Sequence, residues 1–506
     1  MRAKTLQILW HDKLPIFAID FHPTLNFKFA TSGGDSFIRI WSLQSGSIEF
    51  LATLARHSAA VNCIRWSPDG HYLASSGDDG SILLWEQSDK KQLSLGEEDE
   101  NTENWKIAVL LRGTTSEVYD MAWSPDGKQI ASVGIDSSIR IFDIKEQKCV
   151  HVLTDHCHFV QGIAWDPLSN YIATQSSDRS VHLYTYDKDN LKTMPKLLAK
   201  HMKMPMSHKN DLGLTVTKNC FLYHDEDLNS FFRRPAFSPD GSILITPAGI
   251  RSSQTENFTA YVYQRTNLKS GPFACLSGHK KPVVAVRFNP IKFQLKTHDT
   301  STKSNFIPLD YRYIFAIATQ DSVVIYDTQH TNAIAFLGNL HYASLTDISW
   351  SSDGLNLIMT STDGFCSLVE FSPDELGIPY PIEEGTEVKE TIGVASTKQV
   401  EINTLSSNLI KKSSIKSSTI VNALSSNLIK KKIQPTIDQS SLPKPTPKIN
   451  SLSSNLIKKK VQSTISKSMP SKNDDVSMST DSYMKGYVHD QPIVIGDMDE
   501  DMAMEL

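Results

Sequence analysis

The stretch Trp66-Ser-Pro-Asp-Gly70 ends a run of alternating apolar residues and then supplies the residues of a tight turn. Proline and the Asp-Gly pair favour turn dihedral angles that a strand does not hold, so the pattern predicts the corner of a β-hairpin. An aromatic residue followed by such a turn occurs seven times, at Phe21, Trp66, Trp123, Trp165, Phe237, Phe288 and Trp350. We therefore predict seven equivalent structural units.

A second apolar run follows each corner within the same unit. In six units an aspartate precedes that run, namely Asp35, Asp79, Asp136, Asp178, Asp321 and Asp363, whereas the fifth unit has only Thr259-Ala-Tyr-Val-Tyr263. This recurrence is typical of WD-repeat β-propellers, in which each repeat forms a four-stranded blade and the blades close a ring. We predict an all-β, seven-bladed propeller over residues 1–378, closed by residues 4–9 as the outer strand of the seventh blade.

The composition changes after the last unit. Residues 403–470 contain 12 lysines and one acidic residue, whereas residues 471–506 contain two lysines and nine acidic residues. Aromatic residues are almost absent beyond Tyr380, so this part cannot bury enough apolar area to offset its chain entropy. We predict that residues 379–506 form a disordered tail with lysine-rich repeats at 405–465 and an acidic end at 471–506.

Three copies of Leu-Ser-Ser-Asn-Leu-Ile-Lys-Lys begin at Leu405, Leu424 and Leu452. The second copy continues as Ile433-Gln-Pro-Thr-Ile437 and the third as Val461-Gln-Ser-Thr-Ile465. Lysines followed by alternating β-branched residues suit a peptide that adds a strand to a partner's sheet. A replicated low-complexity segment without a partner, or a nuclear-import signal, fits the same residues, and the pattern alone leaves these readings open.

The sequence contains little that resembles catalytic chemistry. It has no nucleophile elbow, P-loop or GxGxxG motif, so we predict a non-enzymatic protein without a cofactor. The pairs His57 with Asp79 and His156 with Asp178 are expected to hydrogen-bond within their blades, as buried polar groups normally do. Asp155-His-Cys-His158 lacks the spaced ligands of a closed metal site.

A resemblance to a known family rests on one long, specific region. It contains Phe221-Leu-Tyr-His-Asp225, Ser230-Phe-Phe-Arg-Arg234 and Phe237-Ser-Pro-Asp-Gly-Ser-Ile-Leu-Ile-Thr-Pro-Ala-Gly249, which a generic propeller does not need. These residues resemble the middle, WD-repeat subunits of chromatin assembly factor 1. The resemblance implies a nuclear histone-chaperone subunit that works with a large and a small subunit to place histones H3/H4 on newly replicated DNA. It implies only indirect contact with DNA and none with a membrane.

The resemblance also gives the tail repeats a partner. In this family and the related Hir repressor proteins, a short basic motif docks onto the anti-silencing-function histone chaperone. The residues that resemble this motif are Lys430, Lys431, Lys432, Ile433, Pro435 and Ile437. A second copy, Lys458, Lys459, Lys460, Val461 and Ile465, has Ser463 in place of the proline, so we expect the first copy to bind better.

Two further groups of residues are candidate contact surfaces. An acidic run between the second and third units, either a solvated loop or a lip that meets basic histone surface, comprises Glu97, Glu98, Asp99, Glu100 and Glu103. For Phe231, Phe232, Arg233 and Arg234 we expect packed phenylalanines and at least one arginine facing a partner subunit, because adjacent arginines are costly to bury unpaired.

Two classes of function are compatible with a non-catalytic propeller. The first is the histone-chaperone subunit, and the second is a substrate adaptor of a ubiquitin ligase or another nuclear scaffold. Copurification separates them, because histones with two chromatin-assembly subunits support the first class and a cullin-type assembly supports the second.

Overall fold

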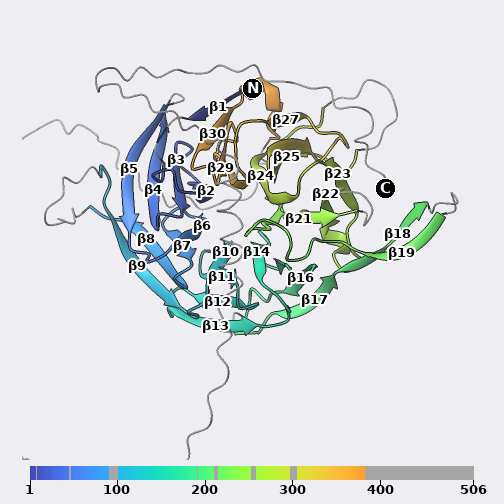
Figure 1. Cartoon of the computed structure of the whole chain (residues 1–506), viewed down its shortest axis with the longest axis horizontal. Helices are drawn as coiled ribbons and strands as arrows, with labels where there is room; N and C mark the ends of the chain where they lie inside the picture. The colour runs from blue at the N-terminus through green and yellow to red at the C-terminus, as the bar shows by residue number, and fades with distance from the viewer. Residues whose placement is uncertain are drawn as a thin grey trace, which may run out of the picture. The chain divides into compact units, whose positions relative to one another are not determined.

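A computed structural model describes residues 1–381, apart from 7, 9, 45–46, 90–100, 191, 210–214, 252–257 and 297–304. These residues form seven four-stranded antiparallel sheets and one two-stranded sheet. Figure 1 shows the seven sheets as blades around a common centre, with β2, β6, β10, β14 and β24 on the inside and β5, β9 and β13 at the rim. The prediction of an all-β, seven-bladed propeller is confirmed.

The first four blades follow one another along the chain. Blade 1 contains β2 (Ile16–Phe21), β3 (Lys28–Gly33), β4 (Phe37–Gln44) and β5 (Ser47–Ala55). Blade 2 contains β6 (Val61–Trp66), β7 (Leu73–Gly77), β8 (Ser81–Gln87) and β9 (Trp105–Arg112). Blade 3 contains β10 (Val118–Trp123), β11 (Gln129–Gly134), β12 (Ile139–Asp143) and β13 (Lys148–Leu153), and blade 4 contains β14 (Val160–Trp165), β15 (Tyr171–Ser176), β16 (Ser180–Thr185) and β17 (Lys196–His201).

The last three blades complete the ring. Blade 5 contains β20 (Ala236–Phe237), β21 (Ile243–Ile250), β22 (Phe258–Gln264) and β23 (Ala274–His279), with a 3-10 turn at Arg265–Asn267. Blade 6 contains β24 (Val283–Phe293), β25 (Arg312–Thr319), β26 (Ser322–Asp327) and β27 (Ala335–Gly338). Blade 7 contains β28 (Leu345–Trp350), β29 (Asn356–Ser361) and β30 (Cys366–Glu370), and the short helix α1 (Pro373–Leu376) follows.

The N-terminal segment closes the ring as predicted, although the strand covers Arg2–Leu6 and not residues 4–9. Strand β1 (Arg2–Leu6) pairs antiparallel with β30, with Lys4 opposite Leu368, and becomes the outer strand of blade 7. Since β1 comes from the start of the chain and β30 is the last strand of blade 7, this pairing joins the N-terminal segment, which precedes blade 1, to the last blade and closes the ring.

The corner at Trp66 shows why these turn sequences end a strand. Gly70 has a φ of 74°, which glycine adopts without strain. The Ser67 hydroxyl donates to Asp69 Oδ1 at 2.5 Å and accepts from the amide of Tyr72 at 2.9 Å. The polar side chains of the motif thus satisfy the backbone groups that leave the ladder, and an apolar cluster with Trp66, Ile38 and Leu83 joins blade 2 to blade 1.

The prediction of a hairpin corner at Phe288 is wrong, because β24 continues through it. Phe288 pairs with Phe315, and after a register shift Lys292 pairs with Tyr313. The Asn289 side chain donates to the carbonyl oxygen of Gly354 in blade 7 at 2.8 Å, so the Asn-Pro sequence forms a bulge held by the neighbouring blade.

Two features lie outside the regular blades. Strands β18 (Lys203–Lys209) and β19 (Thr215–Phe221) form a separate hairpin after blade 4. At the C-terminal side, the amide of Tyr380 donates to the carbonyl oxygen of Lys292 at 2.8 Å, so backbone contacts with blade 6 continue slightly past the predicted domain end. Among the described residues, no helix is long and apolar enough to cross a membrane.

Candidate protein-interaction site

The histidine–aspartate pairs belong to the internal structure of the blades. His57 Nδ1 lies 2.9 Å from Asp79 Oδ2, and His57 Nε2 lies 2.8 Å from the Ser75 hydroxyl. The indole N–H of Trp85 also donates to that hydroxyl, at 2.9 Å. Both ring nitrogens of His57 and the hydroxyl of Ser75 therefore have hydrogen-bond partners within the blade. This confirms the structural interpretation of the pair and removes His57 from the candidates for chemistry.

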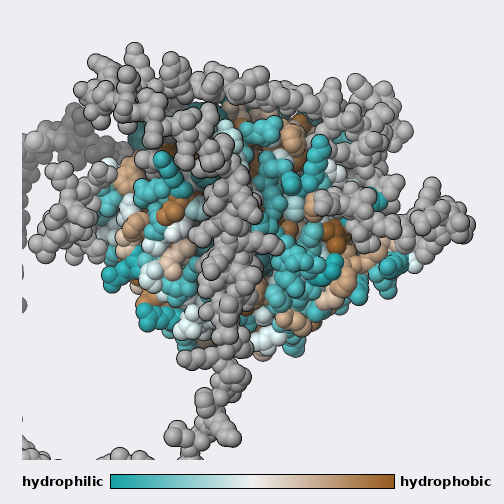
Figure 2. Space-filling view, viewed as in Figure 1, coloured by the Kyte–Doolittle hydropathy of each residue, from teal (hydrophilic) through white to brown (hydrophobic). Residues whose placement is uncertain are grey.

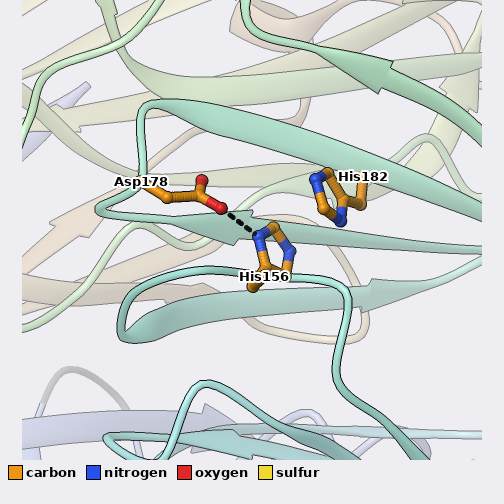
Figure 3. Close-up of side chains that lie close together, drawn as sticks. All are labelled: His156, Asp178 and His182. Carbon is orange, nitrogen blue, oxygen red and sulfur yellow. Dashed lines mark hydrogen bonds and ion pairs between the residues drawn. The ribbon is translucent and has the colours of Figure 1, made fainter.

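Blade 4 contains the corresponding pair and one additional histidine (Figure 3). His156 Nδ1 lies 2.9 Å from Asp178 Oδ2, and His156 Nε2 lies 2.8 Å from the Thr174 hydroxyl. The ring of His182 stacks on that of His156, with centroids 3.7 Å apart and planes 9° from parallel. Burial, with the nearby His156, lowers the pKa of His182 to about 3, so this ring is neutral at physiological pH.

The three side chains do not form a good metal centre, although their potential ligand atoms lie within 4.8 Å of one another. Both nitrogens of His156 already have partners, and lone pairs that lie in two parallel rings do not converge on one ion. Burial acts to raise the pKa of Asp178, but the hydrogen bond and charge interaction with His156, together with hydrogen bonds from Ser180 and the Cys157 amide, outweigh burial and lower it. His158, from the same Asp155-His-Cys-His158 run, bonds instead to the Ser177 hydroxyl.

The family-specific region places an aromatic cluster where the inner strands of blades 1 and 3 begin. Phe231 lies 6.4 Å from Phe17 of blade 1 and 6.4 Å from Tyr119 of blade 3, measured between ring centroids. Phe232 is buried and lies 6.0 Å from Phe17, whereas Phe17 and Phe231 stay half-buried. The expectation of packed phenylalanines is therefore met fully by Phe232 and in part by Phe231.

A small cavity of about 40 Å³ opens beside this cluster, lined in part by Phe17, Ser230, Phe231, Phe232, Thr346 and Thr362. Ser344 also lines it, and Tyr342, two residues earlier in the same loop, is the most exposed large apolar residue of the described chain. Where coloured residues are visible in Figure 2, hydrophobic residues are scattered among hydrophilic ones. We call Phe17, Phe231 and Phe232, with the cavity beside them, the aromatic site, and Tyr342 lies in the loop that supplies the lining residue Ser344.

The two arginines are buried, which contradicts the expectation that one of them faces a partner. Both side chains are fully inaccessible to solvent. The guanidinium of Arg233 donates to the carbonyl oxygens of His224 and Asp225, and burial lowers its pKa to about 9. A Cβ atom on Gly162 of β14 would lie 1.8 Å from the Arg233 carbonyl oxygen, so glycine is required for the segment to pass at this point.

Arg234 connects inner strands from most of the ring. Its Nη1 donates to the carbonyl oxygen of Phe17 in blade 1 at 3.2 Å, and its Nη2 to that of Asn62 in blade 2 at 2.8 Å. It forms ion pairs with Asp120 of blade 3, at 3.7 Å, and with Asp347 of blade 7. Its amide donates to the carbonyl oxygen of Val284 in blade 6, so a residue predicted at an interface is an internal link between blades.

The buried charge of Arg234 belongs to a larger network of charged residues in the inner strands. Asp347 Oδ2 lies 3.1 Å from Arg65 Nη1, and Asp347 Oδ1 lies 3.1 Å from Arg287 Nη2. Burial would raise the pKa of Asp347, but Arg234, Arg287 and Arg65 together outweigh burial and lower it. In this network each buried charge has an oppositely charged partner, which offsets the cost of removing it from water. One sequence signal could have revealed this network, namely single charged residues within otherwise apolar runs: Arg65, Asp120, Arg287 and Asp347.

The acidic run divides into one described residue and four that lie outside the described residues. Glu103 Oε1 lies 2.7 Å from Nζ of Lys28, which is buried, and its other oxygen accepts from the Trp105 indole at 3.1 Å. Glu103 thus joins blades 1 and 2 and is not a free histone contact. The residues outside the description are Glu97, Glu98, Asp99 and Glu100.

The whole lysine-motif region also lies outside the described residues. It includes Lys430, Lys431, Lys432, Ile433, Pro435, Ile437, Lys458, Lys459, Lys460, Val461 and Ile465. Its docking role therefore stays a prediction.

Comparison with known proteins identifies the family. A family model for the CAF1B/HIR1 beta-propeller domain matches residues 1–376. Chromatin assembly factor 1 B subunits are among the relatives, and that of Gallus gallus is 40% identical over 422 residues, which cover 79% of this chain and 72% of that protein. The B subunit of Schizosaccharomyces pombe is 37% identical, and the match covers 75% of this chain and 89% of that protein. Protein HIR1 of Kluyveromyces lactis is 27% identical, and the match covers 77% of this chain and 46% of that protein. The chain belongs to the family of chromatin assembly factor 1 B subunits.

Proposed function

We propose that this protein is a non-catalytic subunit of a nuclear chromatin assembly complex that places histones H3/H4 on newly replicated DNA. The observation that carries the proposal is the family match over the whole propeller, including the region that builds the aromatic site. The described polar clusters support a scaffold, since the histidine–aspartate pairs and the buried arginines are used within and between blades.

The aromatic site is the proposed docking surface for the large subunit of the complex. Aromatic residues are enriched in protein–protein interfaces, and a small pocket beside a half-buried ring can receive one apolar side chain of a partner. Phe231 contributes half-buried aromatic surface and Tyr342, in the loop next to the cavity, contributes exposed aromatic surface, whereas Arg233 and Arg234 are buried and hold their segment in place. This assigns the contact to the phenylalanines of the family-specific segment instead of to its arginines.

Histones and the second chaperone are assigned to other parts of the chain. The acidic residues Glu97, Glu98, Asp99 and Glu100 are proposed to meet basic histone surface, where complementary charge chiefly raises the rate of encounter. The segment from Lys430 to Ile437 is proposed to dock onto the anti-silencing-function chaperone by strand addition, with the lysines meeting acidic groups. The small subunit completes the proposed complex, and DNA is contacted only through the histones.

The large-subunit contact is tested by copurification from cells that express both proteins. Tyr342→Ser combined with Phe231→Ser is expected to reduce large-subunit recovery roughly tenfold or more, since each lost aromatic contact contributes about 1 kcal/mol or more. The matched control is Phe336→Ser, which removes an exposed phenylalanine from β27 at the rim and should leave recovery unchanged. Equal recovery with all variants would place the large-subunit contact elsewhere.

A further inference from the structure

A lysine-rich edge runs from the outer strand of blade 4 into the hairpin that follows it. Residues 191–221 contain six lysines and a single acidic residue, Asp211. The side chains of Lys196, Lys200, Lys203 and Lys218 are exposed, and none of them has a carboxylate within ion-pair distance in the described part of the chain. This edge is therefore a concentrated, unneutralised positive surface.

The hairpin also presents backbone edges. Strands β18 and β19 pair with each other from Lys203 opposite Phe221 to Lys209 opposite Thr215, and neither has another strand beside it among the described residues. Figure 1 shows the hairpin extending away from the blades. Pro205 in β18 has no N–H, which blunts that edge, whereas β19 contains no proline. An added strand is therefore better accommodated beside β19.

The base of the hairpin is anchored, so the edge is presented in a defined orientation. Met204 and Met206 pack against the apolar cluster between blades 4 and 5. The ring of Phe221 contacts two cations, with Arg179 Cζ 3.8 Å and Lys203 Nζ 4.1 Å from its centroid. Such cation–π contacts are attractive and favour one position for the base of β19.

We propose that this lysine-rich edge binds the acidic end of the same chain, with residues 492–496 adding a strand beside β19. The segment reads Pro492-Ile-Val-Ile-Gly496, and its Ile-Val-Ile core has high strand propensity. Acidic residues follow at once, at Asp497, Asp499, Glu500 and Asp501, and can pair with the hairpin lysines. Charge complementarity and strand addition thus act on the same segment.

The chain between residue 381 and residue 492 is long enough for residues 492–496 to reach the hairpin. The chain from residue 381 to residue 492 has a root-mean-square reach of roughly 60 Å as a coil. A compact body the size of the described part has a diameter of roughly 50 Å. Binding within one chain benefits from an effective concentration on the order of millimolar, so a weak contact is sufficient. The bound acidic end shields the hairpin lysines from nucleic acid and other acidic partners, and salt weakens this shielding.

Zero-length carbodiimide cross-linking of the full chain, followed by mass spectrometry of the monomer band, tests the proposal. We expect amide links from Lys203 or Lys218 to the carboxylates of residues 497–501. Ile493→Ser with Val494→Ser should reduce these links by roughly tenfold or more, because two strand-forming apolar contacts are lost while every charge is kept. The matched control, Ile410→Ser in the first lysine repeat, should leave the yield unchanged.

Each alternative occupant gives a different result. Links that persist in the Ile493 and Val494 variant indicate charge contact without strand addition and overturn the proposal. Links confined to a dimer band indicate a second copy of the chain and also overturn it. If the lysines show no links to the tail but are protected from modification by added duplex DNA, the edge is a nucleic-acid surface and the proposal fails.

Discussion

Replacing Arg234 with methionine should destabilise the propeller more than any exposed charge change. The substitution removes donors to the carbonyl oxygens of Phe17 and Asn62, at 3.2 and 2.8 Å, and leaves the Asn62 acceptor buried and the Phe17 acceptor partly buried. These two bonds are worth about 2 kcal/mol together. Loss of the charged contact with Asp347 adds about 1.5–3 kcal/mol, reduced because Arg65 and Arg287 still face that carboxylate.

The sum predicts that the free energy of unfolding falls by about 3–5 kcal/mol, the range for removing one partner of a buried pair. Guanidinium unfolding of the full chain, followed by tryptophan fluorescence, measures it. Arg234→Lys keeps the charge but not the planar fork of donors, so its loss should be intermediate. Arg56→Met, on an exposed loop, is the control and should change stability by less than about 0.5 kcal/mol. A loss below about 1 kcal/mol for Arg234→Met would refute the role of this arginine as the link between blades.

Three further predictions concern the blades and the tail. The pKa of Asp79 is lowered from 3.8 to about 2, because its hydrogen bonds and charge interaction with His57 and its bonds to nearby amides together outweigh burial. The ionised Asp79 therefore stabilises the folded state fully above the unfolded pKa, and this contribution fades as the pH falls towards about 2. Comparing acid unfolding of Asp79→Asn with the parent should show a stability difference that shrinks across this range. Gly162→Ala should lower the free energy of unfolding by about 3 kcal/mol in thermal unfolding, because the added Cβ would meet the carbonyl oxygen of Arg233. Gly34→Ala is the control and should leave stability nearly unchanged, because the nearest atom to its Cβ lies 3.5 Å away. Ile433→Asp should abolish binding of a Lys430 to Ile437 peptide to the anti-silencing-function chaperone in calorimetric titration, and binding that persists would remove Ile433 from the docking contact.

The sequence predicted those features that depend on neighbouring residues. The corner at Trp66 and the pair of His57 with Asp79 lie within one blade, and local turn chemistry and spacing define them. The corner at Phe288 failed because Asn289 bonds to a residue of the next blade, 65 positions away. No local pattern contains that partner.

Arg234 was misplaced for the same reason. Adjacent arginines at 233 and 234 indicate exposure unless partners exist. Arg233 is paired with the nearby carbonyl oxygens of His224 and Asp225, whereas Asp120 and Asp347, the partners of Arg234, lie on strands distant in sequence. Ring closure brings these strands together around Arg234. A charged residue inside each of several apolar inner strands was the only available sign, and it shows that pairing is required without showing which residues pair.

Purification of the tagged full chain from dividing cells, with mass spectrometry of the bound proteins, tests the central claim most directly. The proposed function predicts recovery of histones H3 and H4 together with a large and a small chromatin-assembly subunit. Recovery of a cullin-type ubiquitin ligase assembly, without histones and without these two subunits, would contradict it.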